Sequence, residues 1–469
     1  MSGPSAVPNH LVRRRRGRDM LSREENELLT RVGKDTPMGD LMRQYWHPAL
    51  LSAEVPEPDG PPVRVRLLGE DLVAFRDTDG RVGLLGANCP HRGAPLYFGR
   101  NEEGGLRCIY HGWKFDTCGR CLEMPNVPPG SDYKDKVRTT AYRSVEKNGI
   151  VWAYLGPLAE PLPPPELDWT ELPVEHKLIT KQYLECNYAQ ALEGDLDPSH
   201  ISFLHSPLDP TGPGDYQGSA GVPLSDRYLT DAALEPSIKA HEKVPQMFVR
   251  KTDYGLIVGA RRDARSERAY WRFTQLVLPF YVFVPGSVDS PLHCNAWVPV
   301  DDEHTLVWRI QYLAARPFTE QELARLSNGL GAHVPRDGYL PATSEPSGAW
   351  MPRANRGNDY LQDRKVQRTV SFSGIRGIWA QDRVCTEGMG AIMDRTREHL
   401  GPSDLTIIQM RRLLLTAVTA LREHGTPPLG LGVTPPIVPA PTVFLPERLT
   451  WDELSKEYLS GKAKVTAPG

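Results

Sequence analysis

Asn88-Cys89-Pro90-His91-Arg92-Gly93 and Arg107-Cys108-Ile109-Tyr110-His111-Gly112-Trp113 are the two segments of this chain with the strongest chemical signal. Each holds one cysteine and one histidine, and sixteen residues lie between His91 and Cys108. Two thiolates and two imidazoles in alternation suit a two-iron, two-sulfide cluster, in which one iron takes both cysteines and the other takes both histidines. The pattern therefore predicts an electron-transfer centre bound by Cys89, His91, Cys108 and His111.

A structural zinc site is the alternative, because zinc sites also use cysteine and histidine in pairs. Zinc ribbons and fingers usually pair like with like, whereas each pair here is mixed. The segment 118–121, Cys-Gly-Arg-Cys, follows closely and would complete a four-cysteine zinc site. We favour a turn at Gly119, because Trp113–Phe115 and Arg120–Met124 have the composition of two flanking strands. The mixed pairs thus favour a cluster of the Rieske type.

The composition limits the function classes. Lys and Arg number 55 and Asp and Glu 58, and the net charge of -3 argues against a general nucleic-acid binder. The seven cysteines are an odd number scattered along the chain, which is not a secreted disulfide framework. No apolar run reaches the roughly 18 residues that span a bilayer. We expect a cytoplasmic protein of two domains, with neither a membrane nor a nucleic acid as partner.

The N-terminus carries a basic group, Arg13–Arg16 with Arg18. A twin-arginine export signal is one interpretation, but no apolar segment follows it. We therefore expect residues 1–19 to form a disordered leader. An amphipathic pattern begins at Met20 and opens a helical lead-in segment over residues 20–62.

Residues 63–156 have the pattern of an all-β domain. Val63–Leu68 alternates between apolar and polar residues, and Asp79-Gly80 and Asn148-Gly149 are hairpin signals. The two Cys/His segments fall between such strands, so we expect the cluster on two facing loop tips. Gly93 and Gly112 are expected to let backbone N–H groups approach the sulfides.

A proline-rich linker is predicted over residues 157–182, and a proline-rich C-terminal extension without regular structure over 426–469. Strands and helices occur in separate blocks between them, which predicts an α+β domain over 183–425. The expected strands are Tyr270–Val284, Leu292–Val300 and Thr305–Leu313, and the expected helices are Asn187–His205, Arg383–Leu400 and Leu405–Glu423.

A second group of ligand-type side chains lies in the segment 187–205. Two histidines and one carboxylate form the facial triad of non-haem ferrous oxygenases, which leaves open positions for O2. On an ideal helix His200 and His205 diverge by about 140°, so the helix must end, kink or bulge between them. Pro198 is a cause of such an irregularity. Otherwise the two histidines are ordinary helix residues. Glu193 shares a helical face with His200 and is one candidate for the carboxylate.

From Met20 onward the chain resembles the large subunits of Rieske non-haem iron ring-hydroxylating oxygenases, and most of all the phthalate 4,5-dioxygenase group with its aryl O-demethylase relatives. The resemblance rests on four blocks, which are Leu21–Val32, Cys89–Ala94 with Cys108–Asp116, Ala191–His205, and Gln381–Gly390 with Asp394–Gly401. It implies an all-β Rieske domain followed by a helix-grip catalytic domain with an antiparallel sheet.

The resemblance also implies roles for single residues. Cys89, His91, Cys108 and His111 match the cluster ligands, and the ligands of a mononuclear Fe²⁺ match His200, His205 and Asp382. Asp197 matches the carboxylate that joins the two centres across a subunit interface, and Asn187 matches a polar residue near the iron. By spacing alone, Glu193 is the alternative to Asp382 as the carboxylate ligand of the iron. Asp382 would otherwise be an N-terminal residue of the expected helix Arg383–Leu400.

The implied function is the terminal oxygenase component of a multicomponent system. An NADH-dependent flavin and iron–sulfur reductase would supply electrons, and the subunits would form a homotrimer or a stacked hexamer. The implied substrate is a small aromatic acid, and Arg250, Arg261, Arg262 and Arg272 are candidates for binding its carboxylate. Tyr254–Arg262 is expected to line the pocket.

Three alternative functions stay open at this stage. Removal of an aryl O-methyl group would use the same iron site as ring hydroxylation. A Rieske electron carrier would lack the second metal. A zinc-stapled interaction protein would be colourless.

Overall fold

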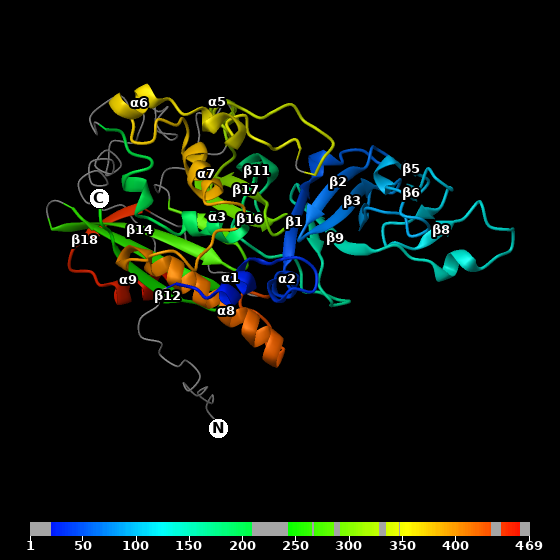
Figure 1. Cartoon of the computed structure of the whole chain (residues 1–469), viewed down its shortest axis with the longest axis horizontal. Helices are drawn as coiled ribbons and strands as arrows, with labels where there is room; N and C mark the ends of the chain where they lie inside the picture. Colours follow the sequence, from blue (N-terminus) through cyan, green and yellow to red (C-terminus); the bar gives the residue numbers. More distant parts are fainter. Residues whose placement is uncertain are drawn as a thin grey trace.

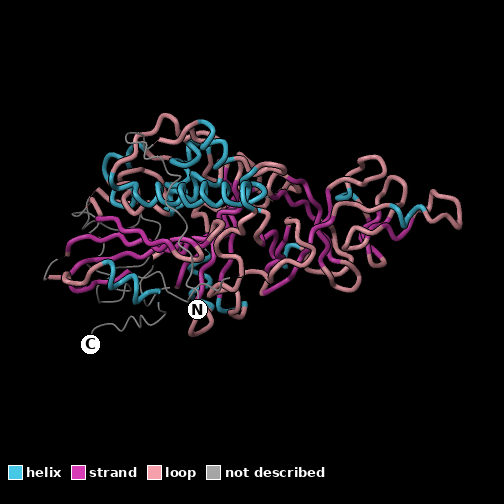
Figure 2. Tube along the Cα trace, turned by 90° about the horizontal axis from the view of Figure 1, so that it is seen from below, coloured by secondary structure: helices cyan, strands magenta, loops and turns pink. Residues whose placement is uncertain are grey.

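Three antiparallel sheets form the framework of the chain in the computed structural model (Figures 1 and 2). The structure describes residues 20–208, 243–264, 267–285, 291–327, 334–346, 348–432 and 442–459. The expected leader, residues 1–19, therefore lies outside the described residues. Figure 1 shows a smaller β-rich part at one end and a larger part with most of the helices at the other.

The smaller part is built on a six-stranded sheet in the order β1-β10-β9-β4-β3-β2, with a four-stranded sheet β5-β6-β7-β8 beside it. The first sheet comprises β1 (Trp46–Leu51), β2 (Val63–Leu67), β3 (Glu70–Arg76), β4 (Val82–Gly86), β9 (Ala141–Lys147) and β10 (Ile150–Tyr154). The second comprises β5 (Arg100–Glu102), β6 (Gly105–Arg107), β7 (Lys114–Phe115) and β8 (Cys121–Glu123).

The β domain begins earlier than predicted. Strand β1 pairs with β10, and its residues from Trp46 to Leu50 are buried. The lead-in segment 20–62 therefore divides into a helical part and the first strand of the β domain. This strand could not be predicted because Pro48 interrupts its pattern, and the pairing shifts in register between Pro48 and Leu50.

The larger part contains an eight-stranded sheet in the order β11-β17-β16-β15-β14-β13-β12, and β18 pairs with β14. Its strands are β11 (Lys177–Leu184), β12 (Gln246–Lys251), β13 (Gly255–Asp263), β14 (Arg268–Val277), β15 (Tyr281–Val284), β16 (Leu292–Pro299), β17 (Thr305–Tyr312) and β18 (Thr442–Pro446). All of their pairings are antiparallel, which confirms the predicted α+β architecture.

Two predicted domain limits differ from this sheet. Strand β11 pairs with β17 over its whole length, so the linker ends before Lys177 and not at residue 182. The C-terminal extension contributes β18 and the helix α9 (Trp451–Leu459), although regular structure was not expected there. The packing of Trp451 beside Trp271 explains this difference, because it buries apolar surface that a composition count does not show.

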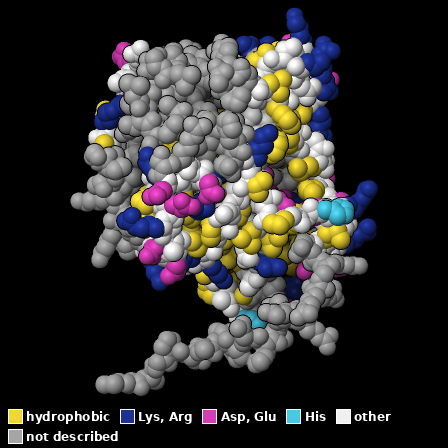
Figure 3. Space-filling view, turned by 90° about the vertical axis from the view of Figure 1, so that its left-hand side faces the viewer, with side chains coloured by type: hydrophobic (Ala, Val, Ile, Leu, Met, Phe, Trp, Pro, Cys, Tyr) yellow, Lys and Arg dark blue, Asp and Glu magenta, His cyan; other side chains and the backbone are white. Residues whose placement is uncertain are grey.

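Helices α3 (Tyr188–Asp195) and α8 (Leu405–His424) cover the same side of the eight-stranded sheet, and α7 (Ile378–Gly388) packs on α3 (Figure 1). The other α-helices in the described residues are α1 (Arg23–Thr30), α2 (Pro37–Met42), α5 (Glu320–Arg325) and α6 (Arg364–Thr369). No helix in the described part of the chain is both long enough and apolar enough to cross a bilayer. Figure 3 views the end formed by the larger part, where apolar side chains lie in a broad area among charged ones.

The predicted bounds of α8 were correct to within one residue, whereas the predicted bounds of α7 were wrong at both ends. Helix α8 ends where Gly425 takes the left-handed conformation at φ 64°, a common helix stop. Helix α7 begins at Ile378 and ends at Gly388, and Gly390 follows with φ 96°. The apolar pattern over Arg383–Leu400 therefore belongs partly to a loop, and Asp382 lies inside the helix and not at its N-terminus.

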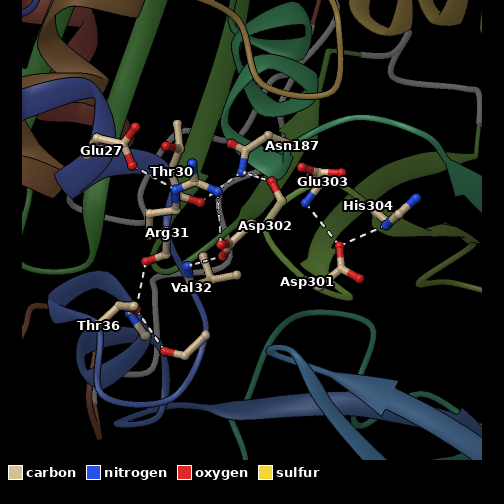
Figure 4. A network of polar contacts seen from close by, with 12 residues as sticks. Glu27, Thr30, Arg31, Val32, Thr36, Asn187, Asp301, Asp302, Glu303 and His304 are labelled. Carbon is tan, nitrogen blue, oxygen red and sulfur yellow. Dashed lines mark hydrogen bonds and ion pairs between the residues drawn. The ribbon is translucent and has the colours of Figure 1, made fainter. Parts of the chain in front are cut away.

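The N-terminal helices are fastened to the larger part by a polar network (Figure 4). The Oδ1 atom of Asp302, in the loop between β16 and β17, accepts from the backbone N–H of Val32 at 2.7 Å, and its Oδ2 pairs with Arg31 at 3.2 Å. Asn187 donates to the carbonyl oxygens of Thr30 and Asp302. The start of α3 is thereby tied to both α1 and the sheet.

Replacing Gly119 tests the packing of the predicted turn. Its φ is +77°, and an added Cβ would lie 2.4 Å from the carbonyl oxygen of Thr139. We expect Gly119→Ala to lower the free energy of unfolding of the β domain by about 3–4 kcal/mol, from backbone strain plus overpacking. The control Gly80→Ala has φ +83° and no atom within 4 Å, so it should cost about 1–2 kcal/mol. Equal losses in thermal unfolding would contradict the packing argument.

Candidate metal centres

The two Cys/His segments form turns with the same hydrogen-bond pattern. The N–H of Cys89 donates to the carbonyl of Ala94 at 2.8 Å, and the N–H of Cys108 donates to that of Trp113 at 2.8 Å. Gly93 and Gly112 both have φ +75°, and each donates its N–H back to the carbonyl of its cysteine. These glycine N–H groups therefore close the turns. Approach of other backbone N–H groups of the loops to the sulfides stays a prediction.

The cysteines pair at the base of these turns and the histidines pair farther out. Cys89 and Cys108 are each only 2 % exposed, and burial raises the pKa of Cys89 to about 11, with the nearby Cys108 adding to the shift. The ring centroids of His91 and His111 lie 4.5 Å apart. His91 also stacks on Trp113 at 4.3 Å and 12°, which fixes the orientation of its ring.

These four residues fit a two-iron cluster better than a single zinc ion. The Nδ1 atom of His111 is buried and has no hydrogen-bond partner, as expected of an atom that binds a metal. Among the described residues, no three ligand atoms from Cys89, His91, Cys108 and His111 lie within 4.8 Å of one another. Separate thiol and imidazole pairs are what two irons require, whereas one tetrahedral ion would need all four ligands together.

The nearby cysteines belong to a turn, as predicted. Asp116 accepts hydrogen bonds from the backbone N–H groups of Cys118 and Arg120, which encloses Gly119 in a tight turn. Cys118 is exposed, whereas Cys121 is buried and directs its thiol to the carbonyl of Glu123. This separation leaves no basis for a four-cysteine zinc site.

The structure brings His200, His205 and Asp382 together, although Asp382 is remote from both histidines in sequence. The Nε2 atoms of the histidines are 3.1 Å apart, and Oδ1 of Asp382 lies 3.1 Å from that of His205 and 3.6 Å from that of His200. Three ligand atoms at these separations fit one ion with bonds of about 2.1 Å. They are the only such group of three or more in the described part of the chain.

Local structure explains how two histidines five residues apart can meet. Helix α3 ends at Asp195, Pro198 follows, and a 3₁₀ turn runs from His200 to Ser202. The predicted irregularity is thus a helix end followed by a tighter turn. His205 lies beyond this turn, where the chain has reversed and its ring faces that of His200 at 80°.

Two neighbouring side chains orient the histidines. Nδ1 of His205 lies 2.6 Å from Oε1 of Gln381, and Gln381 itself donates from Nε2 to the carbonyl of Ile375. Nδ1 of His200 lies 3.5 Å from Oδ2 of Asp197. Contacts of this kind fix which ring nitrogen is free to bind a metal. Gln381 was not among the residues predicted from the sequence, although its position directly before Asp382 was a usable sign.

Charge in this group favours the ionised carboxylate of Asp382. Burial acts to raise the pKa of Asp382, but attraction from His205 and His200 outweighs it and leaves the pKa below the usual value. The carboxylate of Asp197 behaves in the same way: burial opposes ionisation, and the hydrogen bond and charge of His200 prevail.

Two of the residues considered from the sequence lie elsewhere. Asn187 is the N-cap of α3: its Oδ1 accepts from Ala189, and its Nδ2 donates to two backbone carbonyls. These contacts make it a structural residue, and the expected place beside the iron is not supported. Glu193 is buried in ion pairs with Arg395 and Arg411, so its carboxylate is directed away from the histidines.

Comparison with known proteins agrees with both centres. Residues 45–142 match the Rieske [2Fe-2S] domain model, and residues 153–460 match the model of the LigXa C-terminal domain like family. The chain belongs to the Rieske non-haem iron oxygenases. It is an oxidoreductase, the terminal oxygenase component of a multicomponent system that uses O2 and electrons from a partner protein.

Curated relatives cover nearly the whole chain. The 3-chlorobenzoate-3,4-dioxygenase oxygenase subunit of Comamonas testosteroni is 37% identical over 93% of this chain and 98% of its own length. The phthalate 4,5-dioxygenase oxygenase subunit of Pseudomonas putida is 40% identical over 88% of this chain and 89% of its own length.

Solved structures support the fold alone. Dicamba monooxygenase bound to dicamba has a TM-score of 0.53 at 16% identity and covers 81% of this chain and 98% of its own. The QL mutant of NdmA from Pseudomonas putida CBB5 with caffeine has a TM-score of 0.53 at 19% identity, and the match covers 82% of this chain and 93% of its own.

Replacing Gln381 tests how its contact with His205 supports metal binding. We expect Gln381→Leu to weaken Fe²⁺ binding at the His200/His205/Asp382 group by about 10–100-fold, because the imidazole loses its orienting partner. The matched control is Gln190→Leu, which also removes buried amide hydrogen bonds, here to Thr386 and Gly390, but touches no candidate ligand. Anaerobic Fe²⁺ titration measures both. Equal weakening in the two variants would show that Gln381 acts only through stability.

Proposed function

We propose that His200, His205 and Asp382 hold a mononuclear Fe²⁺, and that the enzyme hydroxylates a carboxylated aromatic ring. The observation that carries this proposal is the meeting of three ligand atoms within 3.6 Å in a chain that also has a Rieske domain. Iron in such a facial site supplies the reduction of O2 next to the substrate. The protein supplies the ligand geometry and a buried environment for the reaction.

The electron donor in this proposal is a reductase with flavin and its own iron–sulfur centre, which takes electrons from NADH in the cytoplasm. The loops that carry His91 and His111 suit a docking surface for such a partner. Ile109 and Tyr110 beside them are 62 % and 55 % exposed. Figure 1 places the small sheet of β5, β6 and β8 at the end of the molecule away from α3 and α7. That separation favours electron transfer between neighbouring subunits, as in a head-to-tail trimer.

Asp197 has the geometry of a bridge between such subunits. One of its oxygens accepts from the backbone N–H and the hydroxyl of Ser199, which fixes the carboxylate, and the other faces Nδ1 of His200. Its side chain is 20% exposed, so a cluster histidine of a second subunit can approach it. In this role Asp197 accepts hydrogen bonds from an imidazole on either side.

An aromatic acid is the proposed substrate because both relatives described above are named for one, chlorobenzoate or phthalate. A 5,5'-dehydrodivanillate O-demethylase of Sphingobium is 32% identical over 90% of this chain, but its name describes a methoxylated substrate. Dihydroxylation is therefore the primary proposal, and demethylation is one result that the product assay can reveal.

The four arginines predicted as carboxylate ligands lie in different surroundings. Arg250 pairs with Asp452, and Arg261 pairs with Asp263. The two aspartates are exposed. Arg262 is only 1 % exposed and donates to the carbonyl of Pro198 and to Ser202, on either side of His200. Of these arginines, Arg262 is the one tied to the candidate iron site, and Arg272 remains a prediction.

Product analysis tests the proposed reaction. The purified protein, with a phthalate-dioxygenase-type reductase and NADH, is expected to consume O2 and convert 3-chlorobenzoate or phthalate to a cis-diol. Methoxybenzoates in the same panel would release formaldehyde if demethylation is the true activity. Oxygen consumption that no aromatic compound stimulates would contradict the proposal.

Replacing Asp197 tests the bridge. Asp197→Asn keeps the shape of the side chain but removes its charge, so both metals should remain bound while turnover falls by about 100-fold or more. Asp263→Asn is a matched control, because it removes a carboxylate that is 62% exposed and whose ion pair among the described residues is with Arg261. Single-turnover measurements should show slow electron transfer from the reduced cluster in the first variant alone. Unchanged turnover would contradict the bridging role.

A further inference from the structure

The two predicted cluster histidines have different surroundings. The ring of His91 stacks on Trp113, with 4.3 Å between the ring centroids and 12° between the ring planes. Trp113 is 5 % exposed and donates from Nε1 to Oδ1 of Asn126 at 2.7 Å, so this neighbour is buried and neutral. The ring of His111 lies beside Tyr110, with 3.9 Å between the centroids, and Tyr110 is 55 % exposed. The histidine pair is therefore covered by a buried ring on the His91 side and by a solvent-facing ring on the His111 side.

A cation lies against the solvent-facing ring. The guanidinium carbon of Arg92 is 5.5 Å from the ring centroid of Tyr110, which is within the range of a cation–π interaction. Arg92 is exposed and forms no ion pair with any described carboxylate. Arg92 directly follows His91, and Tyr110 directly precedes His111, so the contact joins the two Cys/His segments. Tyr110 thus touches a cluster histidine and a positive charge at once.

The other arginine of the two Cys/His segments is neutralised. Arg107 also lies close to the second segment, because its Nη1 donates to the carbonyl of Gly112 at 3.1 Å. It pairs with Glu102 and with Glu123, each at 2.8 Å, and these carboxylates offset its charge. Apart from the two histidines, Arg92 is therefore the charge of these segments that no described carboxylate offsets.

A fixed positive charge near an iron–sulfur cluster raises the reduction potential of the cluster. Reduction adds one electron, so a nearby cation stabilises the reduced form more than the oxidised form. Attraction of this kind acts over several ångströms, and dissolved salt weakens it when the cation is exposed. Arg92 can therefore act on the cluster without direct contact with the metal.

The ring of Tyr110 keeps this charge near the ligand. An arginine side chain has several rotatable bonds, and an exposed one samples many positions unless a contact holds it. The cation–π contact supplies such a hold, and the contact of the same ring with His111 places the hold beside the cluster. The effect of Arg92 should therefore depend on Tyr110.

We propose that Arg92, held by the ring of Tyr110, raises the reduction potential of the Rieske cluster. This role concerns the cluster and not the substrate, and it rests on the cluster ligands predicted above. One electron passes from the donor protein to the cluster in each reduction. A higher potential favours that transfer, so a donor of given potential keeps a larger fraction of the protein reduced and ready for turnover.

Redox titration of the purified, cluster-loaded protein tests this role. The readout is the midpoint potential, followed by the visible absorption of the cluster at low ionic strength. Arg92→Gln should disfavour the reduced form by about threefold, which lowers the midpoint potential by about 28 mV, since tenfold corresponds to about 59 mV for one electron. Arg92→Lys keeps the charge without the planar guanidinium and should lie between Arg92→Gln and the wild-type protein. The difference between Arg92→Gln and the wild-type protein should shrink in about 1 M salt, where the screening length is about 3 Å.

Arg64→Gln is the matched control. Arg64 also stacks on aromatic rings of the β domain, at 3.8 Å from the ring centroid of Tyr97 and 5.5 Å from that of Phe98. Among the described residues it contacts no predicted cluster ligand, so its replacement should leave the midpoint potential unchanged. The visible spectrum and the electron paramagnetic resonance signal report whether each variant carries an intact cluster.

Replacing Tyr110 tests whether its ring holds the charge. Tyr110→Leu removes the cation–π contact, so adding Arg92→Gln to this variant should lower the midpoint potential by less than it does in the wild-type protein. Equal shifts in the two backgrounds would contradict the role of Tyr110.

The same titration separates this role from the proposed function. An unchanged midpoint potential in Arg92→Gln, with the cluster signal intact, would overturn the role of Arg92 and leave the oxygenase function untouched. A shift that persists in high salt, or that Arg64→Gln reproduces, would overturn it as well, because a charge beside the ligand would not be its cause. A wild-type protein without a Rieske signal would instead contradict the cluster and the proposed function together.

Discussion

The candidate iron site depends on an interruption of helical structure between Asp195 and His205. On one continuous helix, the two histidines would point about 140° apart and would not reach a common ion. The end of α3, Pro198 and the short 3₁₀ turn reverse the chain instead, and the Nε2 atoms come within 3.1 Å. The hydrogen bonds of Arg262 to both sides of this turn hold it in place.

Much of the remaining architecture supports that turn. Helix α7 brings Asp382 to the histidines because it packs on α3, and α3 is fixed by the cap of Asn187 and by the buried ion pairs of Glu193. The same cap is tied to Thr30 and to the loop that follows β16. The N-terminal helices, the sheet and the iron ligands thus form one connected polar framework, which explains why buried charges are retained far from the chemistry.

Local chemistry could be predicted from the sequence wherever ligand types and spacing are sufficient. The mixed Cys/His pairs predicted the cluster loops, and Pro198 predicted the break after α3. Long-range contacts could not be predicted in this way. Glu193 and Asp382 are both carboxylates at plausible positions, and only tertiary packing shows that the first pairs with Arg395 while the second meets His205. The C-terminal strand β18 was missed for the same reason, because its partner β14 is remote in sequence, whereas Pro48 interrupts the pattern of strand β1.

The number of irons bound per chain tests the central claim most directly. A cluster held by Cys89, His91, Cys108 and His111, together with one ion at His200, His205 and Asp382, predicts three irons and two acid-labile sulfides. Asp382→Ala should then bind two irons and keep its visible colour and its electron paramagnetic resonance signal. Two irons in the wild-type protein after anaerobic reconstitution, or three retained in Asp382→Ala, would contradict the account.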